Sequence, residues 1–154
     1  MELTAVAYAD AVRLASAMSE EMKLRYDDDE GASPAHPEDF LPPYGVFMVG
    51  AVEGQDVACG GLRLLEPGVG EIKRMYVDPD HRGKGLSRQL LVALLEHARA
   101  AGLGEVRLET GTLQPEAIGL YVSEGFLPIA AYGHFADHPQ TLCYALVLSV
   151  AGND

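Results

Sequence analysis

The stretch EIKRMYVDPDHRGKGLSRQLLVALLEHARAAG, residues 71–102, decides the fold. It predicts a strand over 71–77, a turn at 78–80 and a glycine-bearing basic loop that runs directly into a helix. One face of that helix is apolar, with Leu86, Leu90, Leu91, Leu94, Leu95 and Ala98, and Gly102 is placed to end it. Such a helix start leaves backbone N–H groups free at the positive end of the helix dipole. The stretch therefore predicts an anion site, and a phosphate is its usual occupant.

The charge distribution also points to an anion at this loop. The chain has 154 residues and a formal net charge of −12, which argues against nucleic acid as a partner. Five of its eleven Lys and Arg residues nevertheless lie within sixteen positions around the loop: Lys73, Arg74, Arg82, Lys84 and Arg88. Because cations oppose the dipole at a helix N-terminus, their concentration there favours a specific anionic ligand. The alternative is a solvated helix start that happens to carry arginines.

Length and composition predict one soluble domain over residues 1–154. Hydrophobic residues make up 48% of the chain, and no apolar run approaches the roughly 18–20 residues that span a bilayer. The N-terminus carries Glu2 and Asp10 where a secretory signal has basic residues, so no targeting segment is expected. Cys59 and Cys143 match no metal spacing and are expected to be buried free thiols of a cytoplasmic protein.

Turn residues divide the chain into short elements. Strands are expected at 3–6, 46–52, 57–65, 71–77, 105–110, 126–130 and 142–148, helices at 9–27, 86–101 and 115–125, a proline-rich loop at 31–43 and a frayed tail at 152–154. Short connections from 46 to 77 predict an antiparallel meander, while the helix before 105 predicts a parallel pair. The fold class is therefore α/β, a mixed, mostly antiparallel sheet of six or seven strands with helices on both faces.

The basic loop, Arg82-Gly83-Lys84-Gly85-Leu86-Ser87, matches neither of two common phosphate-binding motifs. A dinucleotide fingerprint would need glycine where Arg88 stands, and the P-loop pattern Gly-x-x-x-x-Gly-Lys-[Ser/Thr] is absent. Together with Gln114, Ala117-Ile118-Gly119-Leu120-Tyr121 and Gly125-Phe126, the pattern Arg-x-x-Gly-x-Ser resembles the GNAT superfamily of acyl-CoA-dependent N-acyltransferases. The resemblance runs from about Val46 to Leu148, and residues 108–117 are similar to a bacterial subgroup of uncertain substrate. The family prefers Gly or Ala where Ser87 stands, and many members have Asn where Gln114 stands.

The resemblance implies acetyl-CoA as co-substrate. Backbone N–H groups of residues 83–87 would hold the pyrophosphate, and the exposed backbone of residues 75–77 would bind the acetyl and pantetheine arm. That exposure requires the fourth and fifth strands to splay into a V-shaped cleft, with a bulge in residues 71–77 as the expected device. The implied cofactor-binding set is Met75, Tyr76, Val77, Arg82, Gly83, Lys84, Gly85, Leu86, Ser87, Arg88 and Gln114. Ser87 is also expected to be able to cap the helix.

Two residues are candidates for proton transfer. Tyr121 is the candidate general acid, because a departing CoA thiolate needs a proton and a phenol of pKa about 10 can supply it. The alternative is a core tyrosine. Glu71 is the candidate base, because an ammonium group must lose a proton before it attacks a thioester. The alternative is an ion pair with Lys73, and Glu109 or ordered water are further candidates for the base.

The implied reaction moves an acetyl group from acetyl-CoA to a primary amine of a small molecule or peptide, by direct attack. The alternative is a CoA-binding regulatory or interaction module that has lost transferase activity. No nucleic acid, membrane or metal partner is expected, and a homodimer stays open. Tyr132, His134 and Phe135 border the acceptor pocket or lie on the surface. Eight acids against two basic residues at 20–39 form either a solvated surface or a wall that attracts a cationic amine.

Overall fold

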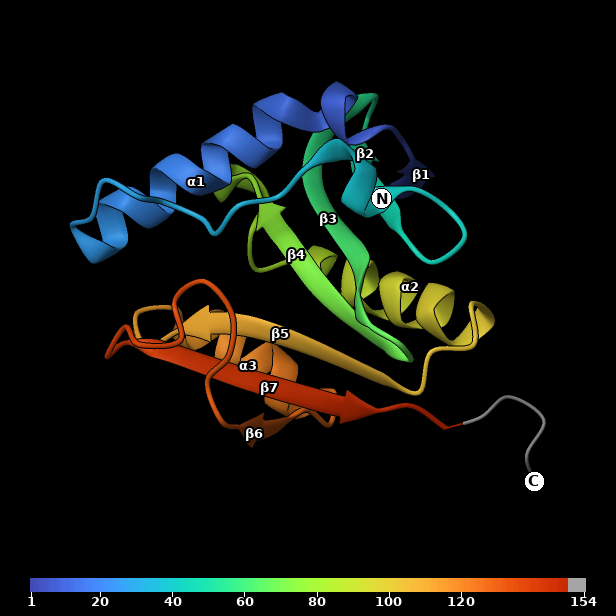
Figure 1. Ribbon diagram of the computed structural model, residues 1–154. Helices are drawn as coiled ribbons and strands as arrows, with labels where there is room; N and C mark the ends of the chain where they lie inside the picture. Colours follow the sequence, from blue (N-terminus) through green and yellow to red (C-terminus); the bar gives the residue numbers. More distant parts are fainter. Residues whose placement is uncertain (150–154) are drawn as a thin grey trace.

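A seven-stranded sheet with helices on both faces organises the computed structural model, which describes residues 1–149 (Figure 1). The strands are β1 (Glu2–Ala5), β2 (Val46–Val52), β3 (Gln55–Glu66), β4 (Val69–Val77), β5 (Glu105–Gly111), β6 (Leu127–Ile129) and β7 (Thr141–Val147). The helices are α1 (Val12–Tyr26), α2 (Leu86–Ala100) and α3 (Pro115–Ser123), with short 3-10 turns η1 (Tyr8–Ala11), η2 (Pro37–Phe40) and η3 (Pro79–His81). The expected tail at 152–154 lies outside the described residues.

The sheet order is β1-β2-β3-β4-β5-β7-β6, and β4 with β5 is its one parallel pair within residues 1–149. The predicted fold class, a mixed and mostly antiparallel sheet, is therefore confirmed. Pro115 at the first position of α3 and Gly102 with φ 82° after α2 are confirmed too. Both follow from backbone chemistry, since proline needs no N–H at a helix start and glycine adopts positive φ freely.

Six of the seven strands differ from the predicted bounds by one or two residues, and two of these differences have a clear physical reason. β3 begins at Gln55 rather than at 57, because Glu53 and Gly54, with φ 52° and 79°, form a two-residue turn that lets the strands pair at once. The strand predicted at 126–130 is shortened to β6. Phe126 is instead buried in the core, and its N–H donates to the Tyr121 carbonyl at the end of α3 over 3.0 Å.

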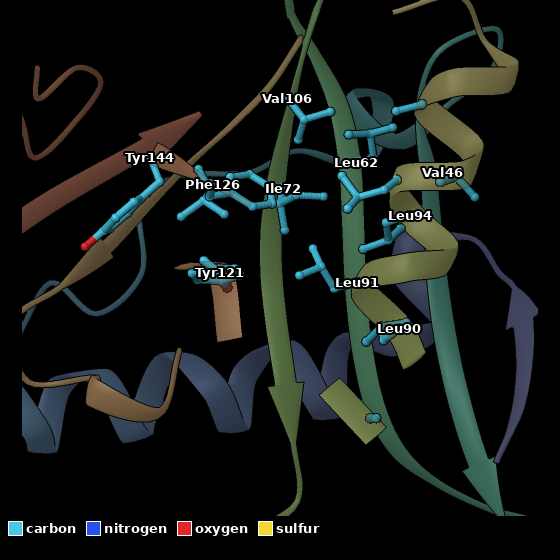
Figure 2. Packing of buried hydrophobic residues seen from close by; sticks show 14 of the residues in the cluster. Val46, Leu62, Ile72, Leu90, Leu91, Leu94, Val106, Tyr121, Phe126 and Tyr144 are labelled. Atoms are coloured by element: carbon cyan, nitrogen blue, oxygen red, sulfur yellow. The ribbon is translucent and has the colours of Figure 1, made fainter. Parts of the chain in front are cut away.

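The hydrophobic core has two layers, one on each face of the sheet. On one face, Leu90, Leu91 and Leu94 of α2 are fully buried and point toward β3 and β4 (Figure 2). On the other face, α1 and the 3-10 turns η1 and η2 contribute to a smaller cluster that includes Phe40 and Phe47. Each buried leucine stabilises the fold by about 1.5–3 kcal/mol relative to an exposed one. The packing of α2 against the sheet is therefore a large contribution to the stability of the fold.

The parallel pair β4–β5 opens into the predicted cleft. It pairs over four positions only, from Val69↔Glu105 to Ile72↔Leu108, and the strands then diverge beneath α1 (Figure 1). The predicted bulge is also confirmed. Gly61 faces Lys73 and Cys59 faces Tyr76, so two β4 residues oppose one residue of β3 and the strand bends away. Arg74, in the bulge, has φ 62°.

Candidate active site

The basic loop forms an open cradle of backbone donors at the start of α2. Gly83 and Gly85 both have φ 77°, a conformation that glycine adopts without strain, and a Cβ at either position would meet no atom within 4 Å. No backbone N–H of residues 83–88 donates a hydrogen bond within the described part of the chain. Gly85 is the N-cap and no side chain caps the helix, so the expectation that Ser87 could cap it is not met. These donors are therefore without partners among the described residues, as an anion site requires.

A cavity opens from this cradle and runs between α1, β4 and α3. Of the predicted cofactor set it is lined by Met75, Tyr76, Val77, Arg82, Gly83, Gly85, Leu86, Ser87 and Gln114. Lys84 and Arg88 do not line it. Lys84 is exposed, and Arg88 instead contacts Glu124 and donates to the Ser123 hydroxyl over 2.9 Å. Arg88 therefore joins α2 to the end of α3, a contact that local sequence could not reveal.

Arg82 lies in this cavity but is already engaged. Its Nε donates to the Val77 carbonyl over 2.9 Å, one Nη donates to Glu21 over 2.7 Å, and its guanidinium lies 5.5 Å from the centre of the Tyr76 ring. Cationic and aromatic groups so placed attract each other. Arg82 thus links the end of β4 to α1 and borders the cradle with its remaining donors.

A second cavity adjoins the first and lies on the α1 side of the split strands. Its polar wall includes Glu71, Lys73, Arg74 and Glu109, and its far wall includes Phe135 and His138 from the loop before β7. Five residues line both cavities: Met18, Met22, Met75, Gln114 and Tyr121. The two cavities therefore meet beside these five side chains.

Tyr121 stands at this junction. Its side chain is 7% exposed, its ring centre lies 5.8 Å from that of Phe126, and its hydroxyl makes no hydrogen bond within residues 1–149 (Figure 2). Burial raises the pKa of its phenol to about 12, because the charged phenolate loses water. Tyr121 is therefore a core tyrosine, the alternative to a general acid, and its side chain also lines both cavities.

Gln114 is held in one orientation by Tyr26, which sequence reasoning missed. The backbone N–H of Leu113 donates to the Tyr26 hydroxyl over 3.2 Å, and that hydroxyl donates to the Gln114 carbonyl oxygen over 2.9 Å. The chain of donors leaves the amide N–H₂ of Gln114 pointing away from Tyr26. Gly111 makes this possible, since a Cβ there would lie 2.0 Å from the Tyr26 hydroxyl.

Glu71 is 4% exposed and fully engaged. It accepts hydrogen bonds from Arg63 Nε and the Tyr132 hydroxyl, each over 2.7 Å, and Lys73 Nζ lies 3.6 Å from one of its oxygens. Burial and the Glu71 carboxylate together raise the pKa of Tyr132 far above its ordinary value, so that phenol stays a donor. The ion pair with Lys73, the alternative to a base, is present.

Glu109 lies on β5 opposite these groups and has no ion pair within 4 Å among the described residues. Burial raises the pKa of its carboxyl group, an effect that the Lys73 charge only partly offsets. A carboxylate with a raised pKa and no ion-pair partner is better suited to take up a proton than an ordinary one.

The loop between β6 and β7 contributes differently from the expectation. Phe135 lines the second cavity as predicted, and His138 joins it. Tyr132 reaches the site only through Glu71, while His134 contacts Glu30 at the surface. In the acidic segment Asp28 lines the second cavity, whereas Glu21 pairs with Arg82 instead. The segment thus provides one carboxylate to this wall rather than a continuous acidic surface.

Sequence reasoning did not predict that α1 lines both cavities. Met18 and Met22 follow one side of a predicted helix, a signal that indicates burial but not a cleft.

Within residues 1–149 no group of three or more His, Cys, Asp or Glu side chains could hold a metal ion, and no helix is long and apolar enough to cross a membrane. Cys59 and Cys143 are free and buried.

Comparisons with known proteins agree on one family. The family described as "Acetyltransferase (GNAT) family" matches residues 11–126. An IAA acetyltransferase of Azospirillum brasilense is 40% identical over 97 residues, which are 62% of this chain and 63% of that protein. Human N-acetyltransferase 8 is 38% identical over 81 residues, 53% of this chain and 33% of that protein. The chain thus matches less than two thirds of the length of these relatives.

Solved structures of similar fold match nearly the whole chain or about two thirds of it. A Klebsiella pneumoniae protein assigned as an acyl-CoA N-acyltransferase is 32% identical, with a TM-score of 0.78, and the match covers 96% of this chain and 97% of that one. An Elizabethkingia anophelis GNAT protein with acetyl-CoA bound is 19% identical, with a TM-score of 0.61, and the match covers 68% of this chain and 77% of that one. At that identity the likeness concerns the fold alone.

Proposed function

The chain belongs to the acetyltransferase (GNAT) family, and from that premise we propose that it transfers an acetyl group from acetyl-CoA to a primary amine by direct attack. One observation carries the proposal: Tyr121 borders both cavities with a hydroxyl that has no hydrogen-bond partner in residues 1–149. A proton donor at the junction of two cavities stands where an acyl donor and an acceptor would meet.

The fit to acetyl-CoA is supported by the cradle of residues 83–88. Its free backbone donors and two positive-φ glycines suit a pyrophosphate, which needs close approach to the backbone. The bulge in β4 supports the rest of the assignment, because unpaired backbone past Ile72 is available to a pantetheine arm. When bound, acetyl-CoA supplies an activated acetyl thioester.

Tyr121 is proposed as the general acid that protonates the departing sulfur as the C–S bond breaks. A phenol of pKa about 12 is a weak acid, but a thiolate formed in the same apolar surroundings is a strong base. Cys59 illustrates the effect, since burial raises the pKa of its thiol to about 12. Burial thus shifts a thiol and a phenol in the same direction, so a buried phenol can still donate a proton to the departing sulfur.

Glu109 is proposed as the group that takes a proton from the ammonium group, directly or through water, before the amine nitrogen attacks the thioester carbonyl. Its carboxylate lines the second cavity, has no ion pair within 4 Å in residues 1–149 and has a raised pKa. Glu71 stays a candidate for the same role, but Arg63, Lys73 and Tyr132 occupy its oxygens. A base must offer a free lone pair to its substrate, so these contacts favour Glu109.

The test is release of free thiol from acetyl-CoA in the presence of a panel of amines. The panel contains amino acids, polyamines, aminoglycosides and peptides with a free N-terminus, and calorimetry measures acetyl-CoA binding separately. Amine-dependent thiol release, with an acetylated amine seen by mass spectrometry, is the expected result. Acetyl-CoA binding without thiol release from any amine would instead identify a cofactor-binding module without transferase activity.

A further inference from the structure

Two opposite charges face each other where the cleft begins. The last paired residues of the parallel strands are Ile72 and Leu108, so Lys73 and Glu109 are the first residues on either side of the split. Ile72 and Leu108 both belong to the core on the α2 face, which places the next residue of each strand on the α1 face, where both line the second cavity. Their charged atoms are more than 4 Å apart, since no ion pair joins them. The cavity therefore separates a cation from an anion.

The β4 bulge adds a second cation to the same wall. In a regular strand adjacent side chains point to opposite faces, but the extra residue of a bulge breaks that alternation. Lys73 donates to the Ser33 hydroxyl over 2.8 Å, and an Nη of Arg74 donates to the Ser33 carbonyl over 2.7 Å. Both side chains thus converge on one residue of the loop after α1. Each keeps further N–H donors, because lysine has three and arginine five.

Neither charge is fully compensated by the protein. Burial lowers the pKa of Lys73, against the attraction of Glu71, and burial raises the pKa of Glu109. Both shifts mean that the charged form lacks part of the stabilisation it would have in water. A ligand that brings a carboxylate to Lys73 and an ammonium group to Glu109 would restore both at once.

We propose that the acceptor is a free amino acid, with its carboxylate bound by Lys73 and Arg74 and its amine directed to Glu109 and Tyr121. This rests on the proposed transferase function and specifies its acceptor. A polyamine would bring a second cation toward Lys73 and Arg74, and a peptide N-terminus has no carboxylate next to its amine. The two cations thus act as the specificity-determining pair.

The experiment compares matched acceptors that differ at one group. L-phenylalanine is set against 2-phenylethylamine and L-phenylalaninamide, L-leucine against 3-methylbutylamine, and L-ornithine against putrescine, with kcat/KM expressed per unprotonated amine. The free amino acid is expected to be acetylated roughly tenfold to a hundredfold better than its partner, because charge-assisted hydrogen bonds are the stronger class. The Lys73→Met variant should bring that ratio close to one, mainly through KM, whereas Arg99→Met, on α2 outside the cavity, should leave it unchanged.

Four outcomes are distinct. A preference for the free amino acid that Lys73→Met abolishes supports the proposal. Equal or faster acetylation of the decarboxylated or amidated partners overturns it while leaving the transferase function intact. Thiol release with none of these acceptors but with another amine of the wider panel also overturns the inference alone, whereas no thiol release with any amine, despite acetyl-CoA binding, removes the proposed function and this inference with it. The comparison on the unmodified protein is decisive even if Lys73→Met does not fold.

Discussion

The two cavities that meet at Tyr121 are built in opposite ways. The first cavity, which we propose holds acetyl-CoA, takes its anion cradle from one contiguous loop and uses backbone N–H groups. The second cavity, which we propose holds the acceptor, collects side chains from α1, β4, β5 and two loops. Backbone donors at a helix start depend on a few glycines, but converging side chains depend on the whole fold. A backbone cradle can therefore recur in many proteins that bind the same anion. Converging side chains differ from one protein to the next, so we expect them to set the specificity for the acceptor.

Removing the phenol at the junction should have the largest effect. Tyr121→Phe is expected to lower kcat by about 10²–10⁴-fold, the usual contribution of a general acid, while acetyl-CoA binding stays within about twofold. Steady-state kinetics and calorimetry measure the two quantities. Tyr144→Phe removes a hydroxyl from another buried tyrosine that lines neither cavity and should leave kcat unchanged. Equal kcat values for Tyr121→Phe and the unmodified enzyme would remove Tyr121 from the mechanism.

The next largest effect should distinguish Glu109 from Glu71, the two candidate bases in the second cavity. Glu109→Gln is expected to lower kcat/KM by about a hundredfold. In the unmodified enzyme the rate should fall as the pH drops through a pKa above the ordinary 4.5, because only the ionised form accepts a proton. A pH profile that loses this limb in Glu71→Gln but keeps it in Glu109→Gln would assign the base to Glu71.

The substitutions Glu109→Gln and Glu71→Gln should change the thermal stability of the protein in opposite directions. A carboxyl group whose pKa is raised by folding stabilises the protein fully below its unfolded pKa, and that contribution is lost as the pH rises through the folded pKa. Glu109→Gln should therefore raise Tm at neutral pH and change it little in acid. Glu71→Gln should lower Tm, since Arg63 and Lys73 lose their charged partner. Thermal unfolding at two pH values measures both, and a lower Tm for Glu109→Gln at neutral pH would contradict the assignment.

A substitution at a glycine of the cradle should weaken acetyl-CoA binding while the candidate catalytic side chains stay in place. Gly85→Val forces a branched side chain into a left-handed conformation that costs about 1–2 kcal/mol, and its Cβ enters the space before the free donors. The Kd for acetyl-CoA should rise at least about tenfold by calorimetry. Gly54→Val carries the same backbone cost in a hairpin turn, with φ 79° and open space around it, and should lower Tm alone. Similar Kd values for the two variants would refute the cradle.

The smallest effect is expected at the tyrosine that orients Gln114. Tyr26→Phe removes a hydrogen bond worth about 0.5–1.5 kcal/mol, so kcat/KM should fall by roughly two- to tenfold as the amide becomes free to rotate. Tyr44→Phe, at an exposed tyrosine outside both cavities, is the matched control. No change in Tyr26→Phe would show that either orientation of the amide serves.

The fold could be predicted well from the sequence because the patterns that indicate its elements are local. The strand before residue 78, the glycine loop and the period of leucines in α2 are all set by neighbouring residues. The bulge could be expected as well, since a strand beside a cleft must leave donors unpaired. The mistakes arose where a distant partner intervenes: Arg88 meets Glu124 across two helices, and Phe126 is drawn from a strand into the core.

By itself the sequence determined the family, the sheet with its covering helices and the cradle that suits a pyrophosphate, because each depends on backbone conformation and short-range periodicity. The tertiary structure alone decided which charges share the wall of the second cavity. It placed Lys73 opposite Glu109 at the split, turned Arg74 to the same face and used Tyr26 to fix Gln114. Electrostatic interactions act through space, so residues far apart in sequence combine only once the chain has folded.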